Sequence, residues 1–363
     1  MRIGIDYRPA LDVRGGIGVY VQELAAALRA HAPEDELELF GHRLRGPAET
    51  TRTAVPEGAT LHRRRVPAPV LDLAGKVGFG ADRLLGDVDV LHATDYVPIT
   101  STRAPLVATI HDVCFHTLPA CYEPALRERL ARVTDDLVAR AARVIVPCAR
   151  VRDELLAHTG ASADQVRVVP HGPPALVLAG DATALEEPGY VLCVATVQPR
   201  KNIDGLLDAF ALLREQHTGA RLVVAGAAGW DSGALEARLG VQAGVTWYAD
   251  VDREAIGTLY AGAAAVAYPS FGEGFGFPVL EAWHAGAPLL VGADTASADL
   301  AGSGALAVDP HDAQALAAGL RTLLDGGADV ARMIEEGRAR LAGFSWARTA
   351  AATRAVYAEA IAS

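Results

Sequence analysis

The stretch SFGEGFGFPVLEA, residues 270–282, combines a glycine-rich turn with the start of an apolar helical pattern. A run of mostly apolar residues over 264–269 precedes it and predicts a buried strand. Pro278 suits the first turn of a helix, because the N–H that proline lacks would be unpaired there in any case. We therefore expect a strand, a turn and then a helix from about Phe277 to Ala285.

Apolar runs of this kind alternate with helical patterns along the whole chain. In the first half, strands are predicted over 36–40, 88–92, 106–111, 143–147 and 166–170, and helices over 17–30 and 123–142. The pattern breaks in the Pro- and Gly-containing segment 170–188 and then restarts. In the second half, strands are predicted over 190–197, 221–226, 245–248, 264–269, 288–291 and 305–308. Alternation of this kind is typical of parallel sheets covered by helices.

The length of 363 residues exceeds what one hydrophobic core usually organises, so two domains are expected. We predict an α/β protein with two doubly wound Rossmann-like domains, over 1–174 and 175–345, that face each other across a cleft. The carboxyl ends of the strands should line this cleft, where open α/β sheets bind ligands. Residues 346–363 have helical apolar spacing, which predicts a C-terminal helix that is a candidate to pack back on the first domain.

The composition is that of a folded protein, with 51% hydrophobic and 21% charged residues. The net charge of −11 argues against nucleic acid as a partner, because binding a polyanion requires a basic face. The four cysteines form no CxxC pair and no metal-ligand spacing, so we interpret them as reduced thiols. We expect no signal peptide, no transmembrane helix and a cytoplasmic location.

One basic cluster runs against this acidic composition. Arg63, Arg64 and Arg65 are consecutive in the sequence. A solvated strand edge or loop would explain them, and so would contact with an anionic acceptor or a membrane surface. The sequence leaves both interpretations open.

The turn in residues 270–282 has the features of a phosphate site. Gly274 and Gly276 have no side chain to obstruct a phosphate that approaches the backbone. The N-terminal end of the following helix attracts anions through its unpaired N–H groups and its dipole. Two carboxylates, Glu273 and Glu281, border the same end and make sense there if hydroxyl groups donate hydrogen bonds to them. We interpret Glu281 as an acceptor for a ribose and Glu273 as an acceptor for a hexose. The simpler alternative is a capping glutamate in a glycine-rich turn.

A second polar segment, ATVQPRKN over residues 195–202, follows the first strand predicted in the second half. Arg200 and Lys201 precede a helix that should begin near Ile203, which is a position suited to binding a diphosphate. The chain has only two lysines, Lys76 and Lys201, which hints that a compact ammonium group is needed at 201. The alternative is a solvated helix start. We expect Lys201 to be exposed and to contribute little to stability.

A glycine loop precedes the first predicted helix. Gly15 and Gly16 resemble part of a dinucleotide fingerprint, but eight residues separate Asp6 from Gly15, whereas the fingerprint follows its strand directly. We therefore do not expect nicotinamide binding. A plain flexible turn is one interpretation of this loop, and the other depends on the family resemblance given below.

Polar side chains also follow two neighbouring strands of the first half. His111 and Asp112 come at the end of the predicted strand 106–111, where side chains should emerge at the ligand-binding edge of the sheet. His92 and Asp95 end the preceding strand and are weaker candidates for contact with an acceptor. A structural role is the alternative for each histidine.

With these residues in view, the chain resembles the retaining glycosyltransferases of family four, which adopt the two-domain GT-B fold. The family signature of two glutamates separated by seven residues is present as Glu273 and Glu281 in EGFGFPVLE. The resemblance implies that Glu281 binds the ribose of the nucleotide and that Glu273 binds the donor sugar. It extends along nearly the whole chain, and the resemblance to mannosyl- and rhamnosyl-transferring members favours a hexose as the transferred sugar.

The resemblance also implies roles for the other segments. Arg200 and Lys201 match a PRKN-like segment whose cations stabilise the leaving diphosphate, although many members carry Gly-Arg where this chain has Ala195 and Thr196. His111 matches a histidine that contacts the donor sugar and helps to stabilise positive charge at the anomeric carbon. The resulting donor-binding candidates are Gly15, Gly16, Thr196, Arg200, Lys201, Glu273, Gly274, Phe275, Gly276, Phe277 and Glu281. The catalytic candidates are His111, Arg200, Lys201 and Glu273, and the acceptor-side candidates are Asp112, His92 and Asp95.

The expected function is that of a retaining hexosyltransferase. By resemblance it would move a hexose from a nucleotide-diphosphate sugar to a small-molecule, glycan or lipid-linked acceptor, with front-face departure of the diphosphate and without a metal or other cofactor. The donor base could be GDP, UDP or dTDP. A nucleotide-sugar epimerase of the same fold and an inactive sugar-nucleotide-binding protein are the alternatives.

Overall fold

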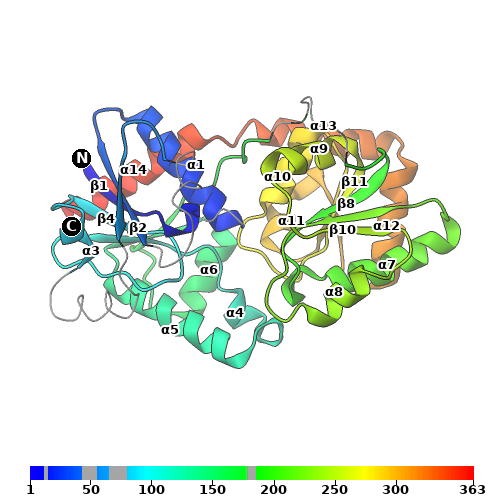
Figure 1. Ribbon diagram of the computed structural model, residues 1–363, viewed down its shortest axis with the longest axis horizontal. Coiled ribbons are helices and arrows are strands. Elements are labelled where there is room, and N and C mark those ends of the chain that lie inside the picture. Colours follow the sequence, from blue (N-terminus) through cyan, green and yellow to red (C-terminus); the bar gives the residue numbers. More distant parts are fainter. Residues whose placement is uncertain (12–14, 43–54, 65–79, 177, 179–184) are drawn as a thin grey trace. The chain divides into compact units, whose positions relative to one another are not determined.

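The computed structural model describes residues 1–11, 15–42, 55–64, 80–176, 178 and 185–363. The chain divides into two compact units whose segments are not continuous in sequence. Unit 1 consists of residues 1–117, 124–172 and 345–363, and unit 2 consists of residues 118–123 and 173–344. Each unit contains a parallel sheet with helices packed against it (Figure 1).

Unit 1 contains the strands β1 (Arg2–Asp6), β2 (Glu36–His42), β3 (Thr60–Arg64), β4 (Val90–Ala93), β5 (Leu106–Thr109), β6 (Arg143–Val146) and β7 (Val166–Val168). Its helices include α1 (Gly16–His31), α4 (Cys114–Thr117), α5 (Pro124–Arg140), α6 (Ala149–His158) and α14 (Trp346–Ala362). The strands are parallel, in the order β3-β2-β1-β4-β5-β6-β7. The order reverses between β1 and β4, which is a topological switch point where such sheets bind ligands.

Unit 2 contains the strands β8 (Tyr190–Val194), β9 (Leu222–Ala225), β10 (Val245–Tyr248), β11 (Ala263–Tyr268), β12 (Leu289–Gly292) and β13 (Leu306–Val308). Its helices are α7 (Ile203–Gln216), α8 (Gly233–Leu239), α9 (Arg253–Gly262), α10 (Phe277–Ala285), α11 (Ala296–Ala301), α12 (Ala313–Asp325) and α13 (Ala328–Leu341). The parallel strands follow the order β10-β9-β8-β11-β12-β13, with a switch point between β8 and β11.

These sheets confirm the predicted fold class of two Rossmann-like α/β domains and a C-terminal helix. Strands β8, β9, β11 and β12 are almost wholly buried, as expected for apolar runs in a sheet covered on both faces. The helix predicted after the glycine-rich turn begins at Phe277 and ends at Ala285, where Gly286 takes the left-handed conformation that closes it. Several strands are shorter than predicted, among them β5, which ends at Thr109, and β8, which ends at Val194.

The C-terminal helix α14 belongs to unit 1, where it packs against α1 and the strands β4, β5 and β6 (Figure 1). Polar contacts fix it at several points along its length. The hydroxyl of Thr349 donates to the carbonyl oxygen of Pro170 at 2.8 Å, and Glu359 is paired with Arg143 and Arg167. This helix therefore completes the first unit, although it comes last in the sequence.

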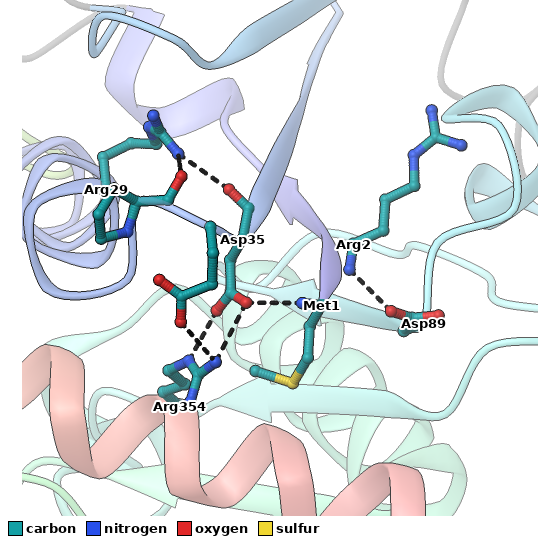
Figure 2. Close-up of polar contacts among 8 residues, drawn as sticks. Met1, Arg2, Arg29, Asp35, Asp89 and Arg354 are labelled. Atoms are coloured by element: carbon teal, nitrogen blue, oxygen red, sulfur yellow. Dashed lines mark hydrogen bonds and ion pairs between the residues drawn. The ribbon is translucent and has the colours of Figure 1, made fainter.

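Asp35 ties both ends of the described chain to the same corner of unit 1. Figure 2 shows its carboxylate between the amino group of Met1, at 2.6 Å, and the guanidinium group of Arg354 on α14, at 2.7 Å. Burial alone would raise the pKa of Asp35, but Arg354 and the amino group outweigh it and lower this pKa. The pairing is shielded, because the Asp35 side chain is only 2% exposed.

One part of the expected domain 1–174 lies elsewhere. Residues 118–123 pack with unit 2, between α4 and α5 of unit 1 in the sequence. The indole N–H of Trp230 donates to the carbonyl oxygen of Cys121 at 2.9 Å, and the Tyr122 ring stacks on the Trp230 ring with centroids 5.2 Å apart. A two-domain boundary drawn at a single point in the sequence misses this exchange, because no composition change marks it.

Candidate active site

The glycine-rich loop and the PRKN segment meet at the switch point of unit 2. Residues 269–276 connect β11 to α10, and residues 195–202 connect β8 to α7. Because β8 and β11 are adjacent parallel strands, the two loops leave the same edge of the sheet next to each other. Arg200 and Lys201 lie at the end of a short 3-10 helix, η4 (Pro199–Lys201), between β8 and α7.

Glu273 is bound by both cations. A guanidinium N–H of Arg200 donates to one carboxylate oxygen at 3.0 Å, and the Lys201 ammonium donates to the other at 2.6 Å. Lys201 also donates to the hydroxyl of Tyr268 at 2.9 Å, and Arg200 donates to the carbonyl oxygen of Gly272 at 2.7 Å. The sequence analysis assigned these three charged residues to the same donor site, but it did not predict that they pair with one another.

Burial corrects the expectation that Lys201 is exposed. Its side chain is 12% exposed, and that of its partner Glu273 is 6% exposed. Burial alone would raise the pKa of Glu273, but the charges of Lys201 and Arg200 outweigh it and lower the pKa to about 2. Glu273 is therefore ionised throughout the neutral range, and the ion pair contributes to the folded structure.

Glu281 has a different environment on α10. The hydroxyl of Tyr260, on α9, donates to its carboxylate at 2.8 Å, and both side chains are buried. Burial raises the pKa of Glu281, and the hydrogen bond from Tyr260 and the charge of Arg253 offset this only in part. The two glutamates of the motif are thus opposite in character, since one is held ionised by cations and the other is a carboxylate that burial disfavours.

The N-terminus of α10 needs a glycine at its cap. Gly276 has φ 107° and ψ 64°, a left-handed conformation that favours glycine. A Cβ at this position would lie 2.6 Å from the hydroxyl oxygen of Ser297.

The other loop candidates are buried or half-buried. Gly274 is buried, and Thr196 is half-buried beside Gly229. The Phe275 ring is 6% exposed and packs edge-on to the Phe277 ring, with centroids 6.0 Å apart. Any contact of Phe275 with a ligand would have to come from its backbone.

His111 lies at the switch-point side of the sheet of unit 1, two residues after β5 ends. Its Nε2 lies 2.9 Å from the carbonyl oxygen of Thr94. A carbonyl oxygen can only accept, so Nε2 carries the proton and donates, which leaves Nδ1 as the acceptor of the neutral ring. Burial lowers the pKa of His111, and this outweighs the hydrogen bond to Thr94 and the charges of Asp95 and Asp112. His111 is therefore a neutral imidazole with an accepting nitrogen.

His92 is a core residue. It is fully buried on β4, and its two ring nitrogens lie 2.7 Å from the hydroxyl groups of Tyr357 and Thr109. Burial lowers its pKa to about 3, so the ring is neutral. Contact with an acceptor does not fit this position, since the strand carries His92 inside the sheet rather than beyond its end.

The two carboxylates proposed for the acceptor side differ. An oxygen of Asp112 accepts from the N–H of Cys114 at 3.0 Å, so Asp112 starts the short helix α4. Asp95 is half-buried after β4, and its pKa is raised by burial and by the nearby charge of Asp6. Asp95 therefore remains the acceptor-side candidate whose carboxylate is not committed to capping a helix.

The remaining candidates are at the surface of unit 1. Gly15 is the extended N-cap of α1, Gly16 is its first residue, and both are exposed. Arg63 is exposed on β3, while the side chain of Arg64 and all of Arg65 lie outside the described residues. An exposed N-cap glycine is compatible with a ligand contact and with a plain turn.

Tyrosines are the residues that sequence reasoning missed. The Tyr268 hydroxyl accepts from Lys201, the Tyr260 hydroxyl donates to Glu281, and both tyrosines are buried. In the sequence, Tyr268 sits in the apolar run that predicts β11 and Tyr260 lies just before that run, and an aromatic residue in such apolar surroundings is interpreted as core. The signal available was that a buried tyrosine hydroxyl needs a polar partner, and a strand end supplies one.

The described residues contain neither a metal-binding group of side chains nor a helix that could span a membrane. In those parts of the chain, no group of three His, Cys, Asp or Glu side chains is arranged to hold a metal ion. Across the same residues, no helix is both long and apolar enough to cross a membrane.

Comparison with known proteins places both halves of the chain. Residues 14–173 match the family described as "Glycosyltransferase Family 4", and residues 181–340 match "Glycosyl transferases group 1". The chain is 30% identical to the O-antigen chain mannosyltransferase B of Escherichia coli over 265 residues, which is 69% of each protein.

Solved structures share the fold. The sucrose-phosphate synthase of Thermosynechococcus elongatus has a TM-score of 0.79 and 21% identity, and the match covers 100% of this chain and 99% of that one. The HepE protein of Anabaena, solved with UDP and glucose, has a TM-score of 0.73 and 18% identity over 98% of each chain. These likenesses show the GT-B fold. The family rests on the sequence matches, and from these the chain belongs to the family 4 glycosyltransferases.

Proposed function

We propose that this glycosyltransferase moves a hexose from a nucleotide-diphosphate sugar to an acceptor hydroxyl, with retention of the anomeric configuration and without a metal ion. The observation that carries the proposal is the cluster of Arg200, Lys201 and Glu273 beside the N-terminus of α10. Two cations and one carboxylate leave one net positive charge at a helix end that also attracts anions. A leaving diphosphate is the anion of a sugar donor that such a site would stabilise.

The cluster is preorganised for charge that grows during the reaction. When the bond from the anomeric carbon to the diphosphate breaks, negative charge develops on the leaving oxygen, and positioned cations stabilise it most effectively in a shielded site. In the proposed front-face course, the acceptor oxygen bonds to the anomeric carbon on the side from which the diphosphate departs. The acceptor proton then passes to a diphosphate oxygen.

Glu281, Glu273 and His111 are assigned to the donor as acceptors of hydrogen bonds from its hydroxyl groups. Glu281, held by Tyr260, would accept hydrogen bonds from the ribose hydroxyls, and Glu273 from a hydroxyl of the sugar. The Nδ1 lone pair of His111 would accept from another sugar hydroxyl and face the positive charge at the anomeric carbon. The name of the E. coli relative favours mannose as the sugar, and the UDP complex of HepE favours a nucleoside diphosphate as the product ligand.

The first experiment identifies the nucleotide. Thermal unfolding is measured with GDP, UDP and dTDP, because a ligand at 100 times its dissociation constant adds about 2.7 kcal/mol of stability. The matching donors, GDP-mannose, UDP-glucose or dTDP-rhamnose, are then incubated with free sugars, oligosaccharides and lipid-linked sugars. Absence of transfer to every acceptor, with epimerised donor in its place, would refute the proposed reaction.

Transfer is expected to continue after exhaustive chelation with EDTA, because cationic side chains and helix N–H groups take the place of a metal at the diphosphate. Proton NMR of the early product should show the anomeric configuration of the donor. Activity that disappears with EDTA and returns with Mg²⁺ or Mn²⁺ would show that the reaction needs a metal. An inverted early product would exclude retention.

Glu281→Gln is expected to weaken binding of the nucleoside diphosphate by about 10- to 100-fold, because hydrogen bonds to a charged acceptor contribute roughly 1.5–3 kcal/mol. The same variant should unfold at a higher temperature than the wild type at pH 7. Burial raises the pKa of Glu281 in the folded state, so the wild type loses stability as the pH rises from the unfolded pKa through the folded one.

Calorimetric titration and thermal unfolding at pH 4 and pH 7 measure both effects. The stability gain of Glu281→Gln should be present at pH 7 and shrink at pH 4. The corresponding 2′-deoxy nucleotide should lose affinity for the wild type but little for the variant. Equal discrimination against the 2′-deoxy nucleotide by both proteins would remove Glu281 from the ribose site.

A further inference from the structure

A line of buried polar side chains connects α14 to the neighbourhood of His111, and all of it lies within unit 1. The ring of Tyr20, on α1, packs edge-on to the ring of His111, with centroids 5.0 Å apart and an interplanar angle of 82°. The Tyr20 hydroxyl is hydrogen-bonded to the hydroxyl of Thr109, the last residue of β5, at 3.0 Å. His111 thus touches a side chain whose position depends on a hydrogen bond in the sheet.

The line continues across the sheet to the C-terminal helix. The hydroxyl oxygen of Thr109 lies 2.7 Å from Nε2 of His92, and Nδ1 of His92 lies 2.7 Å from the hydroxyl of Tyr357 on α14. Tyr20, Thr109, His92 and Tyr357 are each at most 1% exposed. Four side chains from α1, β5, β4 and α14 therefore form one continuous hydrogen-bonded chain inside the unit.

These four side chains are held by hydrogen bonds that need particular partners, which ordinary apolar packing does not. A buried polar group that lacks a partner costs roughly 1–3 kcal/mol, whereas apolar side chains of similar shape could fill the same space without that risk. A neutral His92 donates through one nitrogen and accepts through the other, so the hydroxyl groups on its two sides must play opposite roles. The directions of the two bonds to His92 are therefore linked, and the loss of one of the four side chains disturbs the hydrogen bonds of the others.

We propose that Tyr357 is a positioning residue for His111, acting through His92, Thr109 and Tyr20. The proposal rests on the function proposed above, in which His111 contacts the donor sugar. His111 itself is held by its bond to the Thr94 carbonyl and by ring contacts with Tyr20, Tyr96 and His171. Among these, the Tyr20 ring is the contact that the hydrogen-bonded side chains hold in place. The last helix of the chain thereby fixes the orientation of a group that acts on the sugar.

The test compares loss of the hydrogen-bonded chain with loss of helix docking alone. Tyr357→Phe and Thr109→Val each remove one hydroxyl and should lower kcat by about tenfold, because small displacements of a reacting group have large kinetic effects. The donor KM and the affinity for the matching nucleoside diphosphate should stay within twofold, since the nucleotide contacts are assigned to unit 2. Thr109→Ser keeps the hydroxyl and should recover most of the lost kcat.

Arg354→Ala is the matched control. It removes the ion pair of α14 with Asp35 without touching the hydrogen-bonded chain, so it should lower the melting temperature and leave kcat within threefold of the wild type. A kcat that falls equally in Arg354→Ala and Tyr357→Phe would overturn the proposal, because the loss would then follow stability. A folded Tyr357→Phe or Thr109→Val with kcat within threefold of the wild type would overturn it as well.

A spectroscopic readout separates this proposal from the proposed reaction. The ring ¹⁵N signals of His111 report its tautomer, and we expect the wild type to show the Nε2–H form alone and Tyr357→Phe to show a mixture. Unchanged signals in the variant would refute the positioning role even if the wild type transfers sugar. A wild type without transferase activity would refute the proposed reaction, and the ¹⁵N spectra would still decide whether Tyr357 orients His111. If Tyr357→Phe does not fold, the Thr109→Val and Thr109→Ser pair decides on the same measurements.

Discussion

Replacing Lys201 by alanine is expected to lower kcat by roughly 10²–10³-fold, the usual effect of losing one preorganised group that stabilises charge in a transition state. Glu273 and Tyr268 hold the ammonium group in place. Charge on the diphosphate grows as the glycosidic bond breaks, so the loss should appear in kcat more than in the donor KM. Steady-state kinetics of the variant and the wild type measure both constants.

Lys201→Arg should recover part of this loss, because a planar guanidinium delivers its charge with a different geometry. The alanine variant is also expected to be less stable than the wild type, since Glu273 loses one of two buried cations. Its melting temperature must therefore be measured beside the kinetics. A folded Lys201→Ala enzyme that keeps kcat within threefold of the wild type, or about 0.65 kcal/mol, would contradict the diphosphate role.

Glu273→Gln is expected to destabilise the protein by roughly 3 kcal/mol at pH 7, because removing one partner of a buried ion pair leaves the other charges uncompensated. Arg200 and Lys201 would both lose a charged acceptor at once. The expected magnitude is at the lower end for such changes, since the glutamine carbonyl still accepts one hydrogen bond. Urea unfolding of the two proteins gives the difference.

The stability difference between the wild type and Glu273→Gln should become smaller as the pH falls. The pKa of Glu273 is lowered to about 2 in the folded protein, so its stabilising effect is present above the unfolded pKa and is lost as the pH falls through the folded one. The difference in free energy of unfolding between the wild type and Glu273→Gln should therefore be largest above about pH 5 and become smaller toward pH 2.

Glu335→Gln is the control for this substitution. It is the same change in the same unit, at an exposed ion pair with Arg338, and it should alter stability by less than about 1 kcal/mol. If Glu273→Gln and Glu335→Gln behave alike at all pH values, the buried pair is not a stabilising feature of unit 2.

Local patterns in the sequence predicted most of the strands and the helix α10, although no strand was predicted at β3. The family resemblance assigned Arg200, Lys201 and Glu273 to one donor site. Alternating apolar runs predict a parallel sheet, and two loops that follow adjacent strands of one sheet must lie close together. The pairing of the three charges was not predictable, because residues 72 and 73 positions apart meet only after the strand order is known. The same limit explains why Lys201 was expected to be exposed.

His92 shows a second limit on what the sequence can predict, namely whether a side chain lies in the core or at the edge of the sheet. Its position near the end of a predicted strand was correct, but whether a histidine points into the core or out of the sheet depends on where the strand ends and on what covers it. The covering residue is Tyr357, which is 265 positions away in the sequence. No pattern within either segment indicates such a partner, so the core role of His92 became visible only in the structure.

The discontinuous make-up of the two units has a consequence for recombination between relatives. Unit 2 is largely an insertion between residues 172 and 345 of unit 1, so exchanging 173–344 as a cassette would leave α14 with its native partners. A hybrid joined only once, after residue 172, would instead pair a foreign α14 with the native β4, β5 and β6. Even the exchange of 173–344 would break one native contact. Residues 118–123 would still come from the recipient protein, and they would contact the donor protein's residue at position 230 in place of Trp230. Functional chimaeras should therefore be most frequent when both parent proteins have an aromatic residue at position 230.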